Sequence, residues 1–114
     1  MITIVAGSRD IDDYSLVRRV IRNCGCPITH MIVGGASGVD KLAWRYARKN
    51  KISHTVLYAE WDKYGKAAGK ARNTEMAMRG KALLAIWDGV SPGTRHMIKT
   101  ARALKLHVFV YRVK

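Results

Sequence analysis

Short apolar runs alternate with helical patterns along the chain, and this alternation limits the possible folds more than any other feature. The runs that predict strands are residues 2–6, 30–33, 53–58, 82–87 and 107–112, all apolar enough to be buried. Strands that alternate with helices form a parallel sheet with helices on both faces. The sequence therefore predicts an α/β fold.

The connections between the runs also predict the order of the strands. Right-handed crossovers and a Rossmann-type winding give a five-stranded parallel sheet of order 3-2-1-4-5. A chain of 114 residues is long enough for one hydrophobic core and too short for a second. We therefore expect a single Rossmann-like domain over residues 1–114.

Helical spacing predicts a helix after each of the first four strands, apart from one long irregular stretch at residues 60–69. Asp12 or Asp13 is expected to cap the first helix, and Ser91, followed by Pro92, the last one. The expected inner faces, in chain order, are Leu16, Val17, Val20 and Ile21; Leu42, Ala43, Tyr46 and Ala47; Ala71, Thr74 and Met78; and Met97, Ala101 and Leu104.

A glycine-rich turn joins the second strand to the second helix. Gly34, Gly35 and Gly38 leave the backbone amides uncovered, and a strand that runs through such a turn into a helix points N–H groups at an anion. Ser37 with Asp40 also forms a capping-box pattern, which any helix start can carry. The turn therefore predicts either a phosphate-binding loop or an ordinary helix start.

Three loops are expected to meet where the winding of the sheet reverses, between the first and fourth strands. Open α/β sheets bind ligands at this place. Arg9 and Arg72 are suited to bidentate contacts with phosphate, and Asp40 to accepting a bond from a ribose hydroxyl. Trp61 and Tyr64 are candidates for stacking on a base, or alternatively close the edge of the core. Hydroxyl donors are expected from Ser8, Ser37, Ser91 and Thr94.

The net charge of the chain is strongly positive. Twenty-one basic side chains against eight acidic ones give +13, an excess that favours anionic partners, nucleic acid among them. Lys41, Arg45 and Arg48 form one stripe of the second helix, which is either a solvated face or a contact for nucleic acid.

Other classes of protein are excluded by what the sequence lacks. No apolar run approaches the ~20 residues of a membrane span and no signal peptide is evident, so we expect a cytoplasmic protein without membrane contact. Cys24 and Cys26 are the two cysteines of the chain, and they would need histidine ligands placed by the fold to complete a zinc site. Because the four histidines are scattered along the sequence, we interpret the pair as reduced structural thiols. Neither a metal nor a required cofactor is expected.

Four motifs in order carry a family resemblance. They are Gly7-Ser8-Arg9, Gly34-Gly35-Ala36-x-Gly38-Val39-Asp40, Arg72-Asn73 and Asp88-Gly89-x-Ser91-x-Gly93-Thr94. Together they resemble the SLOG superfamily, which includes DprA, the LOG hydrolases and small YspA/YpsA-related proteins, and the chain is most similar to the last branch. The resemblance implies a pocket for a nucleotide or an ADP-ribose-type ligand, formed by Gly7, Ser8, Arg9, Gly34, Gly35, Asp40, Arg72, Asn73, Gly93 and Thr94.

One departure from the LOG pattern bears on chemistry. LOG-type hydrolases have Pro-Gly-Gly-x-Gly-Thr-x-x-Glu, whereas this chain has Met97 where the glutamate would stand. Cleavage of a glycosidic bond needs a carboxylate, which methionine does not supply. We therefore expect a binding protein, a sensor or sequestering module, ahead of DprA-like binding of single-stranded nucleic acid and LOG-like phosphoribohydrolase activity. The sequence leaves open whether the chain forms a homo-oligomer.

Overall fold

A five-stranded parallel sheet forms the centre of the structure, a computed structural model that describes residues 1–113. Its strands lie in the order β3-β2-β1-β4-β5, and each neighbouring pair is parallel. This confirms the predicted fold class and strand order. The strands are β1 (Ile2–Gly7), β2 (His30–Gly34), β3 (His54–Leu57), β4 (Ala82–Trp87) and β5 (His107–Arg112).

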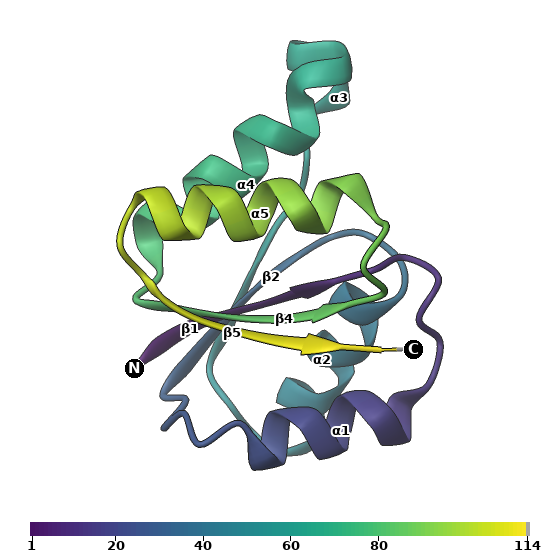
Figure 1. Cartoon of the computed structure of the whole chain (residues 1–114), viewed down its shortest axis with the longest axis vertical. Helices are drawn as coiled ribbons and strands as arrows, with labels where there is room; N and C mark the ends of the chain where they lie inside the picture. Colours follow the sequence, from purple (N-terminus) through teal and green to yellow (C-terminus); the bar gives the residue numbers. More distant parts are fainter. Residues whose placement is uncertain (114) are drawn as a thin grey trace.

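Helices cover both faces of this sheet (Figure 1). Helices α1 (Tyr14–Asn23) and α2 (Val39–Lys49) lie on one face. Helices α4 (Ala68–Arg79) and α5 (Pro92–Ala103) lie on the other. Within residues 1–113 no helix has the length and apolar character needed to cross a membrane.

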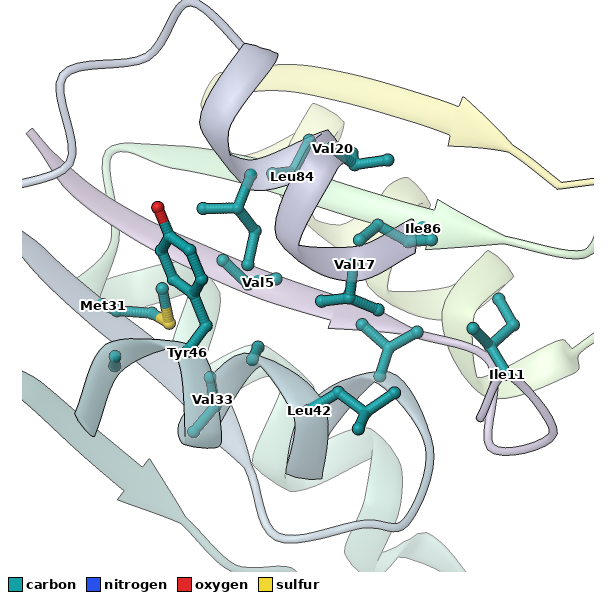
Figure 2. Packing of buried hydrophobic residues seen from close by; sticks show 14 residues of the cluster. Val5, Ile11, Val17, Val20, Met31, Val33, Leu42, Tyr46, Leu84 and Ile86 are labelled. Carbon is teal, nitrogen blue, oxygen red and sulfur yellow. The ribbon is translucent and has the colours of Figure 1, made fainter. Parts of the chain in front are cut away.

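The core between the sheet and the first pair of helices follows the predicted faces (Figure 2). Val17 and Val20 of α1 and Leu42 and Tyr46 of α2 are buried in one cluster with Val5 of β1. The α1 helix starts as predicted, because the Asp13 carboxylate accepts a hydrogen bond from the Leu16 amide at 3.1 Å. Two amphipathic helices with clear apolar stripes thus fix one face of the sheet.

The predicted inner face of the third helix is wrong. Thr74 and Met78 are exposed, and α4 instead buries Asn73, Met76 and Ala77. Small and polar residues spread around α4 leave no dominant apolar stripe, so its orientation depends on tertiary contacts with α5. The predicted inner face of α5 is wrong at one residue only. Met97 and Ala101 are buried as predicted, whereas Leu104, at the C-cap of the helix, is exposed.

The predicted irregular stretch at 60–69 is helical instead. It forms the short helix α3 (Trp61–Tyr64) and the 3-10 helix η1 (Gly65–Ala67), followed directly by α4. The carbonyl of Glu60 accepts bonds from the amides of Lys63 and Tyr64, so the first turn closes locally. Neither short helix buries a residue, and for that reason no apolar periodicity indicated them. The segment projects beyond the end of α4, away from the sheet (Figure 1).

The two edge strands are less buried than predicted, because each has a neighbouring strand on one side only. All four residues of β3 are only partly buried, and every residue of β5 except Val108 is exposed. Tyr58, which follows β3 directly, has an exposed fraction of 70%.

Candidate functional site

A cleft of about 490 Å³ opens beyond the carboxyl ends of the central strands. Its lining combines the β1–α1 loop, the β2–α2 loop and the starts of α4 and α5. The volume lies within the range of ~300–1,000 Å³ that ligand pockets occupy. The cleft therefore lies where the reversal of the strand order was expected to place it.

The β1–α1 and β2–α2 loops lie in close contact at the base of the cleft. Gly38 has a φ of +73°, and a Cβ there would collide with the carbonyl oxygens of Ser8 and Arg9, so only glycine fits. The Val39 amide donates to the Ser8 carbonyl at 3.3 Å. The glycine-rich turn therefore also has a structural role, because it lets the two loops pack backbone against backbone.

The predicted capping box at the start of α2 is wrong. Gly38 occupies the cap position, and no side chain caps this helix. The Asp40 carboxylate instead accepts a hydrogen bond from the Ala36 amide at 3.2 Å, which holds it against the glycine-rich turn.

Asp40 and Arg72 lie together over Gly34, where a Cβ would meet both side chains. Asp40 has an exposed fraction of only 5%. Burial raises the pKa of Asp40 to about 6, although the charges of Arg72 and Arg9 and the Ala36 amide act in the opposite direction. Burial also lowers the pKa of Arg72, with Asp40 opposing that effect. The two groups form a partly desolvated pair in the lining of the cleft.

Arg72 and Asn73 are held in place by neighbouring elements. Arg72 donates to the Leu57 carbonyl at 3.4 Å and to the Asn73 amide oxygen at 3.2 Å. Asn73 donates to the Gly93 carbonyl at 3.2 Å and lies at the same distance from Nδ1 of His96. Burial, followed by the charges of Lys70 and Lys99, lowers the pKa of His96. Asn73 thus joins α4 to the start of α5, while the Arg72 guanidinium faces the cleft.

The β4–α5 loop is folded around Asp88. Its carboxylate accepts bonds from the amides of Val90 and Ser91 at 2.8 Å and from the Ser91 hydroxyl at 3.0 Å. The Ser91 and Val90 amides lower the pKa of Asp88 to about 2. Ser91 does precede α5, with Pro92 as its first residue, but the predicted side-chain cap is absent because Asp88 takes the hydroxyl.

Positive charge dominates the rest of the lining. Arg9, Lys66, Lys70 and Arg72 line the cleft, and the acidic residues among the lining side chains are Asp10 and Asp40. Lys66 and Lys70 were not predicted. They are four residues apart and would have emerged as one face if the segment before α4 had been recognised as helical.

Residues 1–64 match the profile of the YspA, cpYpsA-related SLOG family. The chain belongs to this family. The "Gene 61 protein" of Mycobacterium phage D29 is 35% identical to this chain over 78 residues. The aligned region covers 63% of this chain and 62% of the phage protein. The match thus spans less than two thirds of that relative.

A solved structure shares the SLOG fold described above. DNA processing protein A (DprA) from Streptococcus pneumoniae matches with a TM-score of 0.78 over 98% of this chain and 50% of the DprA chain. The sequence identity is 19%, so this likeness shows a shared fold. The SLOG domain described here thus corresponds in length to about half of DprA.

Most of the predicted pocket residues of this SLOG domain meet at the main cleft. The predicted residues in its lining are Gly7, Arg9, Asp40, Arg72, Asn73, Ser91, Gly93 and Thr94. Gly35, Ser37 and Trp61 line a smaller cleft beside it. Ser8 is fully buried, and its hydroxyl accepts the Asp88 amide at 3.0 Å, so it joins two loops rather than facing a ligand. Gly34 and Gly38 lie in the supporting backbone.

The remaining predicted residues lie elsewhere. Tyr64 is exposed on α3 and belongs to the lining of neither cleft. Lys41, Arg45 and Arg48 are exposed on α2, and the guanidinium of Arg45 lies 4.4 Å from the ring centre of Tyr14. That of Arg48 lies 4.9 Å from the ring centre of Trp44. Sequence reasoning missed Tyr58, although its place at the carboxyl end of the predicted third strand was a usable signal.

The lining of the cleft also includes Met97, the residue that the motif resemblance aligns with the LOG glutamate. Met97 is buried in the core beside Ile98 and Met76 and also lines the cleft. No group of three or more metal-ligating side chains occurs within residues 1–113. Cys24 and Cys26 are partly buried free thiols, and burial, with Cys24 beside it, raises the pKa of Cys26 to about 11.

Proposed function

We propose that this SLOG domain binds a nucleotide or a nucleotide-derived ligand, with phosphate and ribose groups, in the main cleft. One observation carries the proposal: Arg9, Lys66, Lys70 and Arg72 surround a cleft of about 490 Å³. Four cations against two carboxylates favour an anion. Because Met97 takes the place of the glutamate in the LOG-type motif, we propose a sensor or a sequestering module rather than a hydrolase.

Each part of the lining has a role in this proposal. Arg9 and Arg72 contact the phosphates, because a guanidinium presents paired donors to phosphate oxygens. The backbone at Gly93 and Thr94, at the positive end of α5, supports the same charge. Asp40 accepts a bond from a ribose hydroxyl. An ADP-ribose-type ligand, with two phosphates between its riboses, would use all four cations.

Isothermal titration calorimetry with AMP and ADP-ribose tests the proposal. Arg9→Ala and Arg72→Ala should each weaken binding by ~1.5–3 kcal/mol, the range for hydrogen bonds to charged groups. The matched control is Arg102→Ala, which removes an exposed arginine in the last turn of α5. If both cleft variants bind the ligand as tightly as the wild type, the cleft is the wrong site.

A second candidate function is the binding of single-stranded nucleic acid. It is favoured by the unneutralised charge of the surface, because the one ion pair within residues 1–113 joins Arg79 to Glu75. Lys41, Arg45 and Arg48 on α2 are exposed and would contact the phosphates of a strand. Each phosphate contacted steepens the salt dependence by roughly −0.7 in log–log slope for single strands, whereas a nucleotide in the cleft gives a shallow slope.

Fluorescence anisotropy across a salt series separates these two functions. We expect a labelled nucleotide to bind with shallow salt dependence and a labelled single strand to dissociate at moderate salt. Replacing Lys41, Arg45 and Arg48 with glutamine should abolish strand binding and leave nucleotide affinity unchanged. Strand binding that persists at physiological salt and competes with the nucleotide would favour the second function.

A further inference from the structure

A second cleft of about 290 Å³ adjoins the main one. Arg9, Ala36 and Arg72 line both, so the two clefts meet at the pair of guanidinium groups. Of the two clefts, the smaller one is lined by Tyr58 and Trp61 and the main one by neither. Cationic side chains thus separate a polar compartment from an aromatic one.

The two aromatic rings of the smaller cleft are largely exposed to solvent. The exposed fraction is 70% for Tyr58 and 54% for Trp61. Exposed aromatic surface in a concave site indicates a binding role more strongly than isolated exposed rings do. Other rings of the chain already lie beneath cations of the protein itself, namely Tyr14, Trp44, Tyr64 and Trp87.

The backbone holds the Tyr58 ring in place. A Cβ on Gly35 would collide with this ring, so the ring packs directly on the glycine-rich turn. Trp61 begins α3, and its ring reaches toward Gly69 near the start of α4. The rings therefore come from two different segments, one after β3 and one in the projecting α3 turn.

We propose that the Tyr58–Trp61 cleft binds the base of the nucleotide whose phosphates occupy the main cleft, an inference that rests on the proposed function. Aromatic side chains stack on the π-faces of bases, and this interaction tolerates any base. Apart from the two rings and the two arginines, the side chain of this cleft that can form hydrogen bonds is Ser37, which offers little for reading the edge of a base. The ligand is thus a nucleotide held by stacking, with weak discrimination between bases.

A comparison of AMP with ribose 5-phosphate isolates the contribution of the base. We expect the wild type to bind AMP more tightly than ribose 5-phosphate. Tyr58→Leu and Trp61→Leu should each reduce AMP affinity by about 5- to 150-fold, the effect of removing a stacking ring. Both should leave ribose 5-phosphate affinity unchanged. Tyr58→Phe should keep the preference for AMP, and Tyr64→Leu, on α3 outside the cleft, should bind both ligands as the wild type does.

Tryptophan fluorescence gives an independent readout of stacking. AMP should quench part of the emission and ribose 5-phosphate should not, because only a base stacks on the indole. The quenching should disappear in Trp61→Phe and persist in Trp44→Phe and Trp87→Phe. UMP should also quench the emission through Trp61, but less strongly, because uracil offers a smaller stacking area than adenine.

The outcomes distinguish the two proposals. If AMP and ribose 5-phosphate bind equally well and both depend on Arg9 and Arg72, the proposed function holds and the base-binding cleft is refuted. The base-binding cleft is also refuted, and the proposed function kept, if Tyr58→Leu and Trp61→Leu still prefer AMP to ribose 5-phosphate. If the wild type binds neither ligand, or binds AMP independently of Arg9 and Arg72, the proposed function itself fails.

Discussion

Replacing the buried carboxylate of Asp40 with an amide should stabilise the fold at neutral and higher pH. Asp40 is 5% exposed and its pKa in the folded protein is about 6, against 3.8 in the unfolded chain. An acid whose pKa is raised by folding contributes stability below about pH 3.8, and this contribution is lost as the pH rises through 6. At pH 8 the folded protein therefore carries a desolvated charge that the unfolded chain hydrates.

The size of the effect follows from the two pKa values. Their difference of about two pH units corresponds to roughly 3 kcal/mol, as an upper value. The Asp40→Asn side chain has the same shape and retains an oxygen to accept the Ala36 amide. We expect Asp40→Asn to raise the free energy of unfolding by up to about 3 kcal/mol at pH 8, and to have little effect near pH 4.

Urea unfolding followed by circular dichroism, repeated from pH 4 to pH 8, measures this directly. With a typical m-value, the midpoint at pH 8 should rise by about 2 M. Asp10→Asn, at an exposed carboxylate of the same cleft, is the control and should change stability by less than about 0.5 kcal/mol. A less stable Asp40→Asn at pH 8 would show that attraction to Arg72 and Arg9 outweighs burial, and would refute the reasoning.

Four further predictions follow from the loops, the missing glutamate and the thiols. Gly38→Ala should destabilise the fold by ~1–3 kcal/mol in thermal unfolding because of its φ, while Gly93→Ala, with open space around it, should be neutral. Asp88→Ala should lower stability at pH 7, and this difference should shrink as the pH falls from 3.8 toward 2, where wild-type Asp88 protonates. Chromatography after long incubation with nucleoside monophosphates should detect no free base; turnover abolished in an Asp40 or Asp88 variant would contradict this. Iodoacetamide should label Cys26 slowly at pH 8 by mass spectrometry, since its raised pKa keeps the thiol protonated, and fast labelling would argue against its burial.

Elements with strong periodicity could be predicted from the sequence, and those without it could not. The runs at β1 and β4 are central strands that are apolar at almost every position, and α1 and α2 carry clear apolar stripes, so their identity and order follow from local pattern. The short α3 turn closes through the Glu60 carbonyl and buries nothing, so no pattern of side chains indicates it. The inner face of α4 depends on its contact with α5 and on Asn73, which no local pattern contains.

The candidate site was predictable where it depends on topology. Arg9, Arg72 and Thr94 lie far apart in the chain and meet because the strand order brings their loops together. Which side chain faces the cleft was harder to predict, because hydroxyl and carboxylate groups also bond within loops. Ser8 and Asp88 form hydrogen bonds within and between the loops instead of facing the cleft. The bond between them joins residues 80 positions apart, so no local pattern predicts it.

The bonds of Ser8 imply that the two sides of the cleft respond differently to a ligand. Its amide donates to Ile86, its carbonyl accepts from Ile11 and Val39, and its hydroxyl accepts from Asp88, so three loops share one buried residue. A ligand meeting this side finds groups already in position and loses little conformational entropy in ordering them. The α3–η1 segment, which carries Trp61 and Lys66, buries nothing and belongs to the least stable parts of a fold. Hydrogen exchange should therefore slow on ligand binding in residues 60–67 far more than in the loops around Ser8.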